Sequence, residues 1–211
     1  ISSSAFFIVL TLLSNNSSLV IKNININPSR IGVIKILNKM GAKIKLKNIK
    51  NQNGEKSADV FVKSSKLLKG INCPSNLNTS AIDEFLIIFL AASKAKGVSY
   101  FKNLSELNEK ESPRLKIASK ILKMIGIRII SNNSSIKIYG NPNLELKKKF
   151  EIKNYLKDHR VMALSTIAAL TFGGKWKIHN PDSIKTSFPS FFKILKKELG
   201  AKINWKKEKK S

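Results

Sequence analysis

The strongest constraint on the fold is a pattern that occurs three times along the 211 residues. Each copy begins with a proline, continues as an amphipathic helix, ends at a glycine and leads into a short alternating strand. Proline is tolerated in the first helical turn, and glycine readily adopts the left-handed backbone that ends a helix. Apolar residues three and four apart mark the helix, and alternation marks the strand. The three copies run from Pro28 to Gly41 with a strand at 42–46, from Pro113 to Gly126 with a strand at 127–130, and from Pro189 to Gly200 with a strand at 201–205.

The remaining elements fit around these copies. The patterns predict further helices at 4–13, 81–93 and 159–170, and further strands at 19–22, 60–63, 98–101, 136–139 and 175–178. The copies recur every 75 to 85 residues or so, which indicates stacked α/β units that share one core. No interior segment has the composition of a linker, so we expect one domain.

Composition narrows the class of protein. With 42% hydrophobic and 25% charged residues, the chain is typical of a globular protein. Its formal charge of +26 suggests nucleic-acid binding. However, the lysines are spread over almost every segment, together with many isoleucines and asparagines, and no aromatic residues interleave with a basic stripe. A compositional bias explains this charge, so we expect no nucleic-acid partner.

The chain offers few signs of export. Cys73 is its one cysteine, which excludes a disulfide framework and a cysteine-based metal site and favours a reducing compartment. The apolar run Ala5–Leu13 is far shorter than the roughly 20 residues of a spanning helix and lacks the features of a signal peptide. We therefore expect a cytoplasmic protein without a membrane anchor. Because the sequence opens at Ile1 and enters a helix almost directly, we also expect it to be a fragment.

Arginine is scarce and is therefore informative. The chain has 39 lysines and arginines, of which four are arginine. Arg114 ends the run Lys110-Glu111-Ser112-Pro113-Arg114, in which Ser112 is a possible N-cap of the following helix. A guanidinium binds a carboxylate or phosphate through two hydrogen bonds, which lysine cannot imitate. These residues suit an anion site with a nearby proton carrier, although a helix cap with solvated charges explains the same run.

Two other runs share this ambiguity. Asp158-His159-Arg160 precedes an apolar helix, so Asp158 could act only as its N-cap. Asp83 begins another apolar helix and could serve only the helix dipole. We interpret His179, at a strand end, as structural. All three runs lie at helix starts in similar α/β units, so the fold could bring them to one face.

The motifs together resemble a known family, that of 5-enolpyruvylshikimate-3-phosphate synthase, in its C-terminal half. The resemblance covers nearly the whole chain up to Trp205, in the family's order. It lacks the N-terminal half. The principal motifs are Ile82-Asp83-Glu84, Lys110-Glu111-Ser112 with Arg114, Asp158-His159-Arg160 and Ser187-Phe188-Pro189; weaker ones are residues 2–6, 27–30, 40–42 and 58–60.

This resemblance implies a fold and a reaction. The fold is one domain, built from repeated βαβαββ units, of a two-domain inside-out α/β barrel, with the domain at residues 1–206 and a basic tail at 207–211. The reaction moves the enolpyruvyl group of phosphoenolpyruvate to the 5-hydroxyl of shikimate 3-phosphate, in aromatic amino-acid biosynthesis, and requires no metal or organic cofactor. The family's active site lies between two domains. The fragment is therefore expected to need the missing domain for activity, and the full-length enzyme is expected to be a monomer.

The resemblance also implies roles for individual residues. Asp83 would contact the shikimate hydroxyls and accept a proton, and Lys110 and Glu111 would transfer protons near the reacting carbons. Arg114 and Arg160 would bind the phosphate and carboxylate of phosphoenolpyruvate, with support from His159. Lys185 would add another cation, although it is out of register with the family's basic position before Phe188-Pro189.

Some features depart from the family pattern or leave alternatives open. Pro113 replaces an aspartate that is usual before the arginine, and Asn108 replaces a common arginine. The sister transferase that acts on UDP-N-acetylglucosamine shares the fold, but the runs at 110–112 and 158–160 favour the shikimate enzyme. A non-enzymatic nucleic-acid-binding module is the other alternative.

Overall fold

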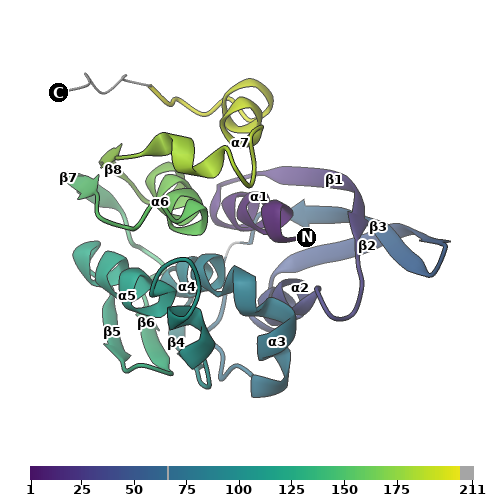
Figure 1. The fold of residues 1–211 in the computed structure, drawn as a ribbon, viewed down its shortest axis with the longest axis horizontal. Helices are drawn as coiled ribbons and strands as arrows, with labels where there is room; N and C mark the ends of the chain where they lie inside the picture. Colours follow the sequence, from purple (N-terminus) through teal and green to yellow (C-terminus); the bar gives the residue numbers. More distant parts are fainter. Residues whose placement is uncertain (66, 205–211) are drawn as a thin grey trace.

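Three helices form the centre of the molecule and three small sheets surround them. The structure is a computed structural model that describes residues 1–65 and 67–204. The central helices α1 (Ser2–Leu13), α4 (Phe85–Ser93) and α6 (His159–Phe172) contact one another pairwise, and the sheets lie outside them (Figure 1). All nine residues of α4 are buried. A helix that is apolar on every side needs such a central position, and this explains why the sheets are outermost.

The first two sheets share one topology. In the first, β1 (Ser18–Asn25), β2 (Lys43–Gln52) and β3 (Glu55–Lys63) have the order β1-β3-β2, with helix α2 (Gly32–Lys39) between β1 and β2. In the second, β4 (Gly97–Phe101), β5 (Arg128–Ser131) and β6 (Ile136–Gly140) have the order β4-β6-β5, with helix α5 (Arg114–Met124) between β4 and β5. All of these pairs are antiparallel. The same path of strand, helix and hairpin confirms the predicted repeat for its first two copies.

The third unit has a different sheet. Strand β7 (Leu146–Ile152) pairs in parallel with β8 (Gly173–Ile178), and α6 connects them. Parallel bridges from Lys69 to Lys96 and from Asn72 to Tyr100 give the second unit a similar strand–α4–strand crossover. A 3-10 turn (Pro181–Ile184), helix α7 (Phe191–Lys193) and a π-helical turn (Ile194–Glu198) follow β8. α7 packs on α1 through the ring of Phe191, which lies 5.7 Å from that of Phe7.

Most predicted elements are confirmed. The glycines that end the three repeated helices, Gly41, Gly126 and Gly200, have positive φ angles of 89°, 83° and 67°. The remaining predicted helices and strands lie at or within a few residues of observed ones, with one exception, the helix predicted at 81–93. Within the described ranges, no helix has both the length and the apolarity that crossing a bilayer requires.

Two predicted elements need correction, and one observed strand was not predicted. The helix predicted at 81–93 is broken into α3 (Asn78–Ala81), a 3-10 turn (Ile82–Glu84) and α4, because Ala81 leaves helical geometry at φ −131° without a glycine or proline to signal it. The described residues 201–204 form no strand: the backbone N–H of Ala201 bonds to Leu195 and closes the preceding turn. Residues 205–211, with the predicted tail, lie outside the described part. Strand β7 was not predicted because three consecutive lysines interrupt its alternation.

Candidate active site

Arg114 is the centre of a cluster of charged side chains. It is the first residue of α5 and only 1% of its surface is exposed. Its Nε donates to Oδ2 of Asp158 at 2.9 Å, its Nη1 to Oδ1 of Asp83 at 3.4 Å, and its Nη2 to Glu111. Carboxylates from its own loop and from two distant segments thus surround one guanidinium, which balances a charge that would be costly to bury alone.

Asp158 connects two helix starts. Its Oδ1 accepts hydrogen bonds from the backbone N–H groups of Arg160 and Val161, at 2.8 and 3.4 Å, and caps α6 as the sequence predicted. Its Oδ2 accepts from Ser112 Oγ at 2.8 Å as well as from Arg114. Burial by itself would raise the pKa of Asp158, but the bonds and charge of Arg114 and the bond from Ser112 outweigh it and lower the pKa. The carboxylate therefore stays ionised and fixes the loop 110–114 to α6.

Arg160 lies beside this network and shares Asp83 with it. Its Nη1 donates to the backbone oxygen of Asp83 at 2.7 Å, and its Nη2 lies 3.5 Å from Asp83 Oδ2. The two carboxylate oxygens of Asp83 thus face two different arginines, Arg114 and Arg160. The 3-10 turn that interrupts the predicted helix is what places Asp83 there.

Glu84 is the buried acid of the same turn. Its Oε1 has no hydrogen-bond partner among the described residues and lies 3.8 Å from Arg160 Nη1. Burial raises the pKa of Glu84, and the neighbouring Asp83 charge adds to the rise, while Ser2 and Arg160 oppose it. Glu84 thus lies close to Arg160 and is far more buried than Asp83.

His159 begins α6 next to the cluster. Burial lowers the pKa of His159, and the positive charge of Arg160 lowers it further, while Asp158 and Glu111 act in the opposite direction. The imidazole is therefore held neutral at pH 7, and in that form each ring nitrogen can only donate or only accept.

Two candidate lysines have ion pairs of their own. Lys110 Nζ lies 2.6 Å from Oε1 of Glu106, within the same loop as Glu111. Lys185 Nζ lies 2.6 Å from Oδ1 of Asp182, in the turn that follows β8. The structure therefore brings Asp83, Glu111, Arg114 and Arg160 into direct contact, and the two lysines have partners elsewhere.

The cluster is closed on one side and open on the other. The side chain of Asp158 is fully buried, whereas those of Asp83 and Glu111 are 38% and 57% exposed. Two fixed guanidinium groups next to two accessible carboxylates can bind an anion and transfer protons to or from it. In the described part of the chain, no group of three or more His, Cys, Asp and Glu side chains could hold a metal ion.

A cavity of about 250 Å³ adjoins this open side. Asp83 and Glu84 form part of its wall, and the rest comes from α1, the segment before α2 and the segment before α4. Its other lining residues are Ser2, Ser29, Arg30, Thr79, Ser80 and Ile82. Hydroxyl groups beside a carboxylate and an arginine give this space the character of a site for a polar, hydroxylated ligand.

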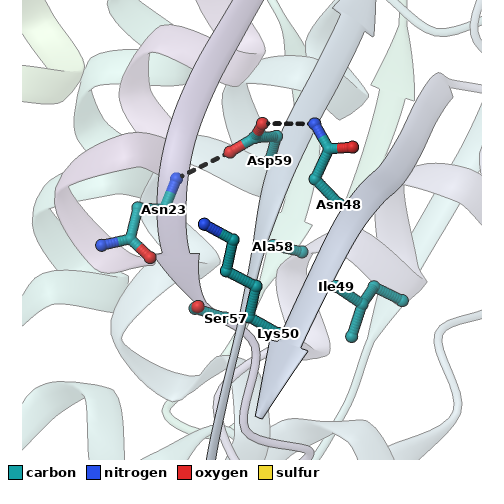
Figure 2. A pocket seen from close by; sticks show the side chains of 7 residues that line it. All are labelled: Asn23, Asn48, Ile49, Lys50, Ser57, Ala58 and Asp59. Atoms are coloured by element: carbon teal, nitrogen blue, oxygen red, sulfur yellow. Dashed lines mark hydrogen bonds between the residues drawn. The ribbon is translucent and has the colours of Figure 1, made fainter. Parts of the chain in front are cut away.

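A larger cavity, about 350 Å³, lies in the first sheet (Figure 2). There Asp59 on β3 accepts a bond from the backbone N–H of Asn23 at 2.9 Å and one from Nδ2 of Asn48 at 2.8 Å. Both asparagines have positive φ angles and lie where the register of β1 and β2 shifts against β3. The bond from Asn48, together with that from Asn23, lowers the pKa of Asp59. This carboxylate links the two strand bulges. None of the site residues predicted from the sequence lines the cavity, so we assign its polar groups a structural role in holding the bulged strands together.

Sequence reasoning found the arginines but missed part of their support. Ser112 was expected as a possible cap of α5. Instead its hydroxyl donates to Asp158, and Pro113 occupies the N-cap position. The contact of Asp158 with Arg114 spans 44 residues, and no local spacing signals it. Asn108, which departs from the family pattern, accepts from the Lys116 N–H and donates to Asn133 O through its side chain.

Comparisons with known proteins bear on the family and the fold of the chain. The family model described as EPSP synthase (3-phosphoshikimate 1-carboxyvinyltransferase) matches residues 1–195. The proteins named 3-phosphoshikimate 1-carboxyvinyltransferase from Caldicellulosiruptor bescii and Petrotoga mobilis are each 38% identical to the chain, over 92% and 93% of its length. The chain spans only 44% and 45% of these two relatives.

Solved structures give the same result. EPSP synthase from Acinetobacter baumannii superposes with a TM-score of 0.86 at 36% identity, over 92% of this chain and 44% of that one. The enolpyruvyl transferase NikO from Streptomyces tendae, at 16% identity and a TM-score of 0.70, shares the fold. The architecture is thus that of an enolpyruvyl transferase domain. Within that class, the chain belongs to the EPSP synthase family, and its length corresponds to a fragment of the family's proteins.

Proposed function

We propose that this chain forms one wall of an active site that moves the enolpyruvyl group of phosphoenolpyruvate to the 5-hydroxyl of shikimate 3-phosphate. The observation that carries the proposal is the convergence of Arg114 and Arg160 with Asp83 and Glu111. The reaction joins the hydroxyl oxygen to the central carbon of phosphoenolpyruvate, with one proton lost from the hydroxyl and one gained by the methylene. Phosphate then leaves the tetrahedral intermediate while the new methyl group gives up a proton, which restores the methylene. Such chemistry needs anion binding and two proton carriers together.

Each candidate residue has a role in this proposal. Asp83 accepts the proton of the attacking hydroxyl, and its position on the wall of the 250 Å³ cavity suits a hydroxylated ring. Glu111, with Lys110 in the same loop, exchanges the proton of the methylene carbon. Arg114 and Arg160 bind the phosphate and carboxylate of phosphoenolpyruvate.

Two further residues have supporting roles. His159, whose imidazole is held neutral, supports Arg160. Lys185, which pairs with Asp182, supplies a further positive charge for the anionic substrates.

The partner of this wall is the other half of the enzyme. We infer that residues 1–206 form the domain and that the N-terminal half closes the cleft, since one wall alone cannot exclude water from the reaction. The complete enzyme acts as a monomer in the cytoplasm, where its two anionic substrates are the only ligands that it needs.

The test is reconstitution of the two halves. The chain is co-expressed with the N-terminal half of the Caldicellulosiruptor bescii relative, and phosphate release from the two substrates is measured. We expect turnover from the pair and none from either half. Arg160→Lys keeps the positive charge but loses the two parallel hydrogen bonds of the guanidinium, and it should reduce turnover by roughly 10²-fold or more. The matched control is Arg128→Lys, since Arg128 stacks on Tyr139 in the outer sheet. Turnover by the isolated chain, no turnover by the pair, or equal effects of the two substitutions would contradict the proposal.

A further inference from the structure

The guanidinium of Arg114 has an inner and an outer side. On the inner side, Nε bonds to Asp158, a fully buried side chain that also accepts from Ser112 and from two backbone N–H groups of α6. On the outer side, Nη1 and Nη2 meet Asp83 and Glu111, which reach solvent. The three carboxylates therefore hold the same cation with very different degrees of constraint.

This difference decides which carboxylate can leave. Glu111 is more than half exposed and pairs with the buried Arg114 from three residues away. When an anion replaces it, Arg114 keeps a partner and the Glu111 carboxylate returns to water, so the exchange should change an equilibrium by a factor of only about two to five, as for an exposed pair. Release of Asp158 would instead break four hydrogen bonds and leave buried charges without partners. An anion that approaches Arg114 from solvent meets the Glu111 side first.

We propose that Glu111 is an internal placeholder for an anionic ligand. Its carboxylate occupies the Nη2 edge of Arg114, and a phosphate or carboxylate group of the ligand displaces it. Asp158 holds Nε throughout and is the positioning residue of this arginine. The inference rests on the proposed function only in treating Arg114 and Arg160 as an anion site.

The exchange has a consequence for proton transfer. While Glu111 is bound to Arg114, one of its carboxylate oxygens is occupied. Displacement by an anion frees this carboxylate to face the reacting group. The proton carrier thus becomes available only when the anion site is occupied.

The test uses inorganic phosphate and the chain by itself, without turnover. Phosphate affinity is measured by titration for the wild type, Glu111→Gln and Glu109→Gln; Glu109 is an exposed carboxylate two residues earlier in the same loop. Because Glu111→Gln removes the competitor, we expect phosphate to bind roughly two- to fivefold more tightly. Glu109→Gln removes the same charge at a screened distance, so its effect should stay below about twofold.

A second measurement needs no change at the site. The chain has four arginines, so the Nε–H groups give four NMR signals, which can be assigned from single Arg→Lys variants. We expect the Arg114 Nε–H to stay protected from solvent exchange with and without phosphate, because Asp158 keeps it. The proposal is overturned if phosphate binds neither the wild type nor Glu111→Gln, if the two glutamine variants behave alike, or if phosphate removes the protection of the Arg114 Nε–H. None of these outcomes depends on whether the reconstituted pair has activity.

Discussion

Asp158→Ala should destabilise the chain more than its small change in volume suggests. Two interactions are lost at once: the cap of α6 and the buried bond to Arg114. Loss of an N-cap costs about 1 kcal/mol. Removal of one partner from a buried ion pair costs about 3–5 kcal/mol, and the lower end applies here because Asp83 and Glu111 still face the arginine. We therefore expect a loss of about 4 kcal/mol in the free energy of unfolding.

A second variant separates the two interactions. Asp158→Asn keeps an oxygen for the backbone N–H groups of Arg160 and Val161 but directs an amide N–H at Arg114 Nε. The cap survives and the ion pair does not, so the loss should be about 3 kcal/mol, which is smaller by the value of the cap. A matched control is Asp182→Ala, which removes an exposed aspartate paired with Lys185 and should change little.

Urea unfolding followed by circular dichroism at pH 7 measures these differences. The pKa of Asp158 is lowered in the folded chain, so its contribution is present above its unfolded value near pH 4 and is lost as the pH falls through the folded pKa. The wild type and Asp158→Ala should therefore converge in stability in strong acid. A loss below about 1 kcal/mol at pH 7, or equal losses for Asp158→Ala and Asp182→Ala, would refute the reasoning.

Two further predictions concern residues around the site. Because burial and Arg160 lower the pKa of His159, protonation favours the unfolded chain, and stability should fall as the pH drops below about 6.5. His159→Gln should flatten this slope in urea unfolding between pH 5.5 and 7.5, and parallel curves for wild type and His159→Gln would contradict the assignment. Gly32→Ala places a Cβ 2.6 Å from the backbone carbon of Ser80, which cannot retreat without moving a wall of the 250 Å³ cavity. Despite the better helix propensity of alanine, we expect a net loss of about 1–3 kcal/mol in the free energy of unfolding. The melting temperature should be lower than that of the exposed control Lys35→Ala. An unchanged melting temperature would show that the contact is loose.

The local elements were predictable for physical reasons. The glycines at 41, 126 and 200 and the apolar spacing before them depend only on nearby backbone geometry, so the repeated helices are evident in the sequence. The break at Ala81 and strand β7 were not predictable, because the first lacks a glycine or proline and the second depends on pairing with β8 across the length of α6. The resemblance of the motifs named the family before any geometry was known.

The sequence alone determined the elements, their repetition and the residues that carry charge near helix starts, because capping, periodicity and turn preferences act within a few residues. Only the tertiary structure decided which charges meet. Asp158 and Arg114 are 44 residues apart and Asp83 and Arg160 are 77 apart, and their contacts exist because the three central helices pack together and bring the segments before α4, α5 and α6 to one side. The packing also decided burial, which makes Asp158 a fixed partner of Arg114 and leaves Glu111 exposed to solvent.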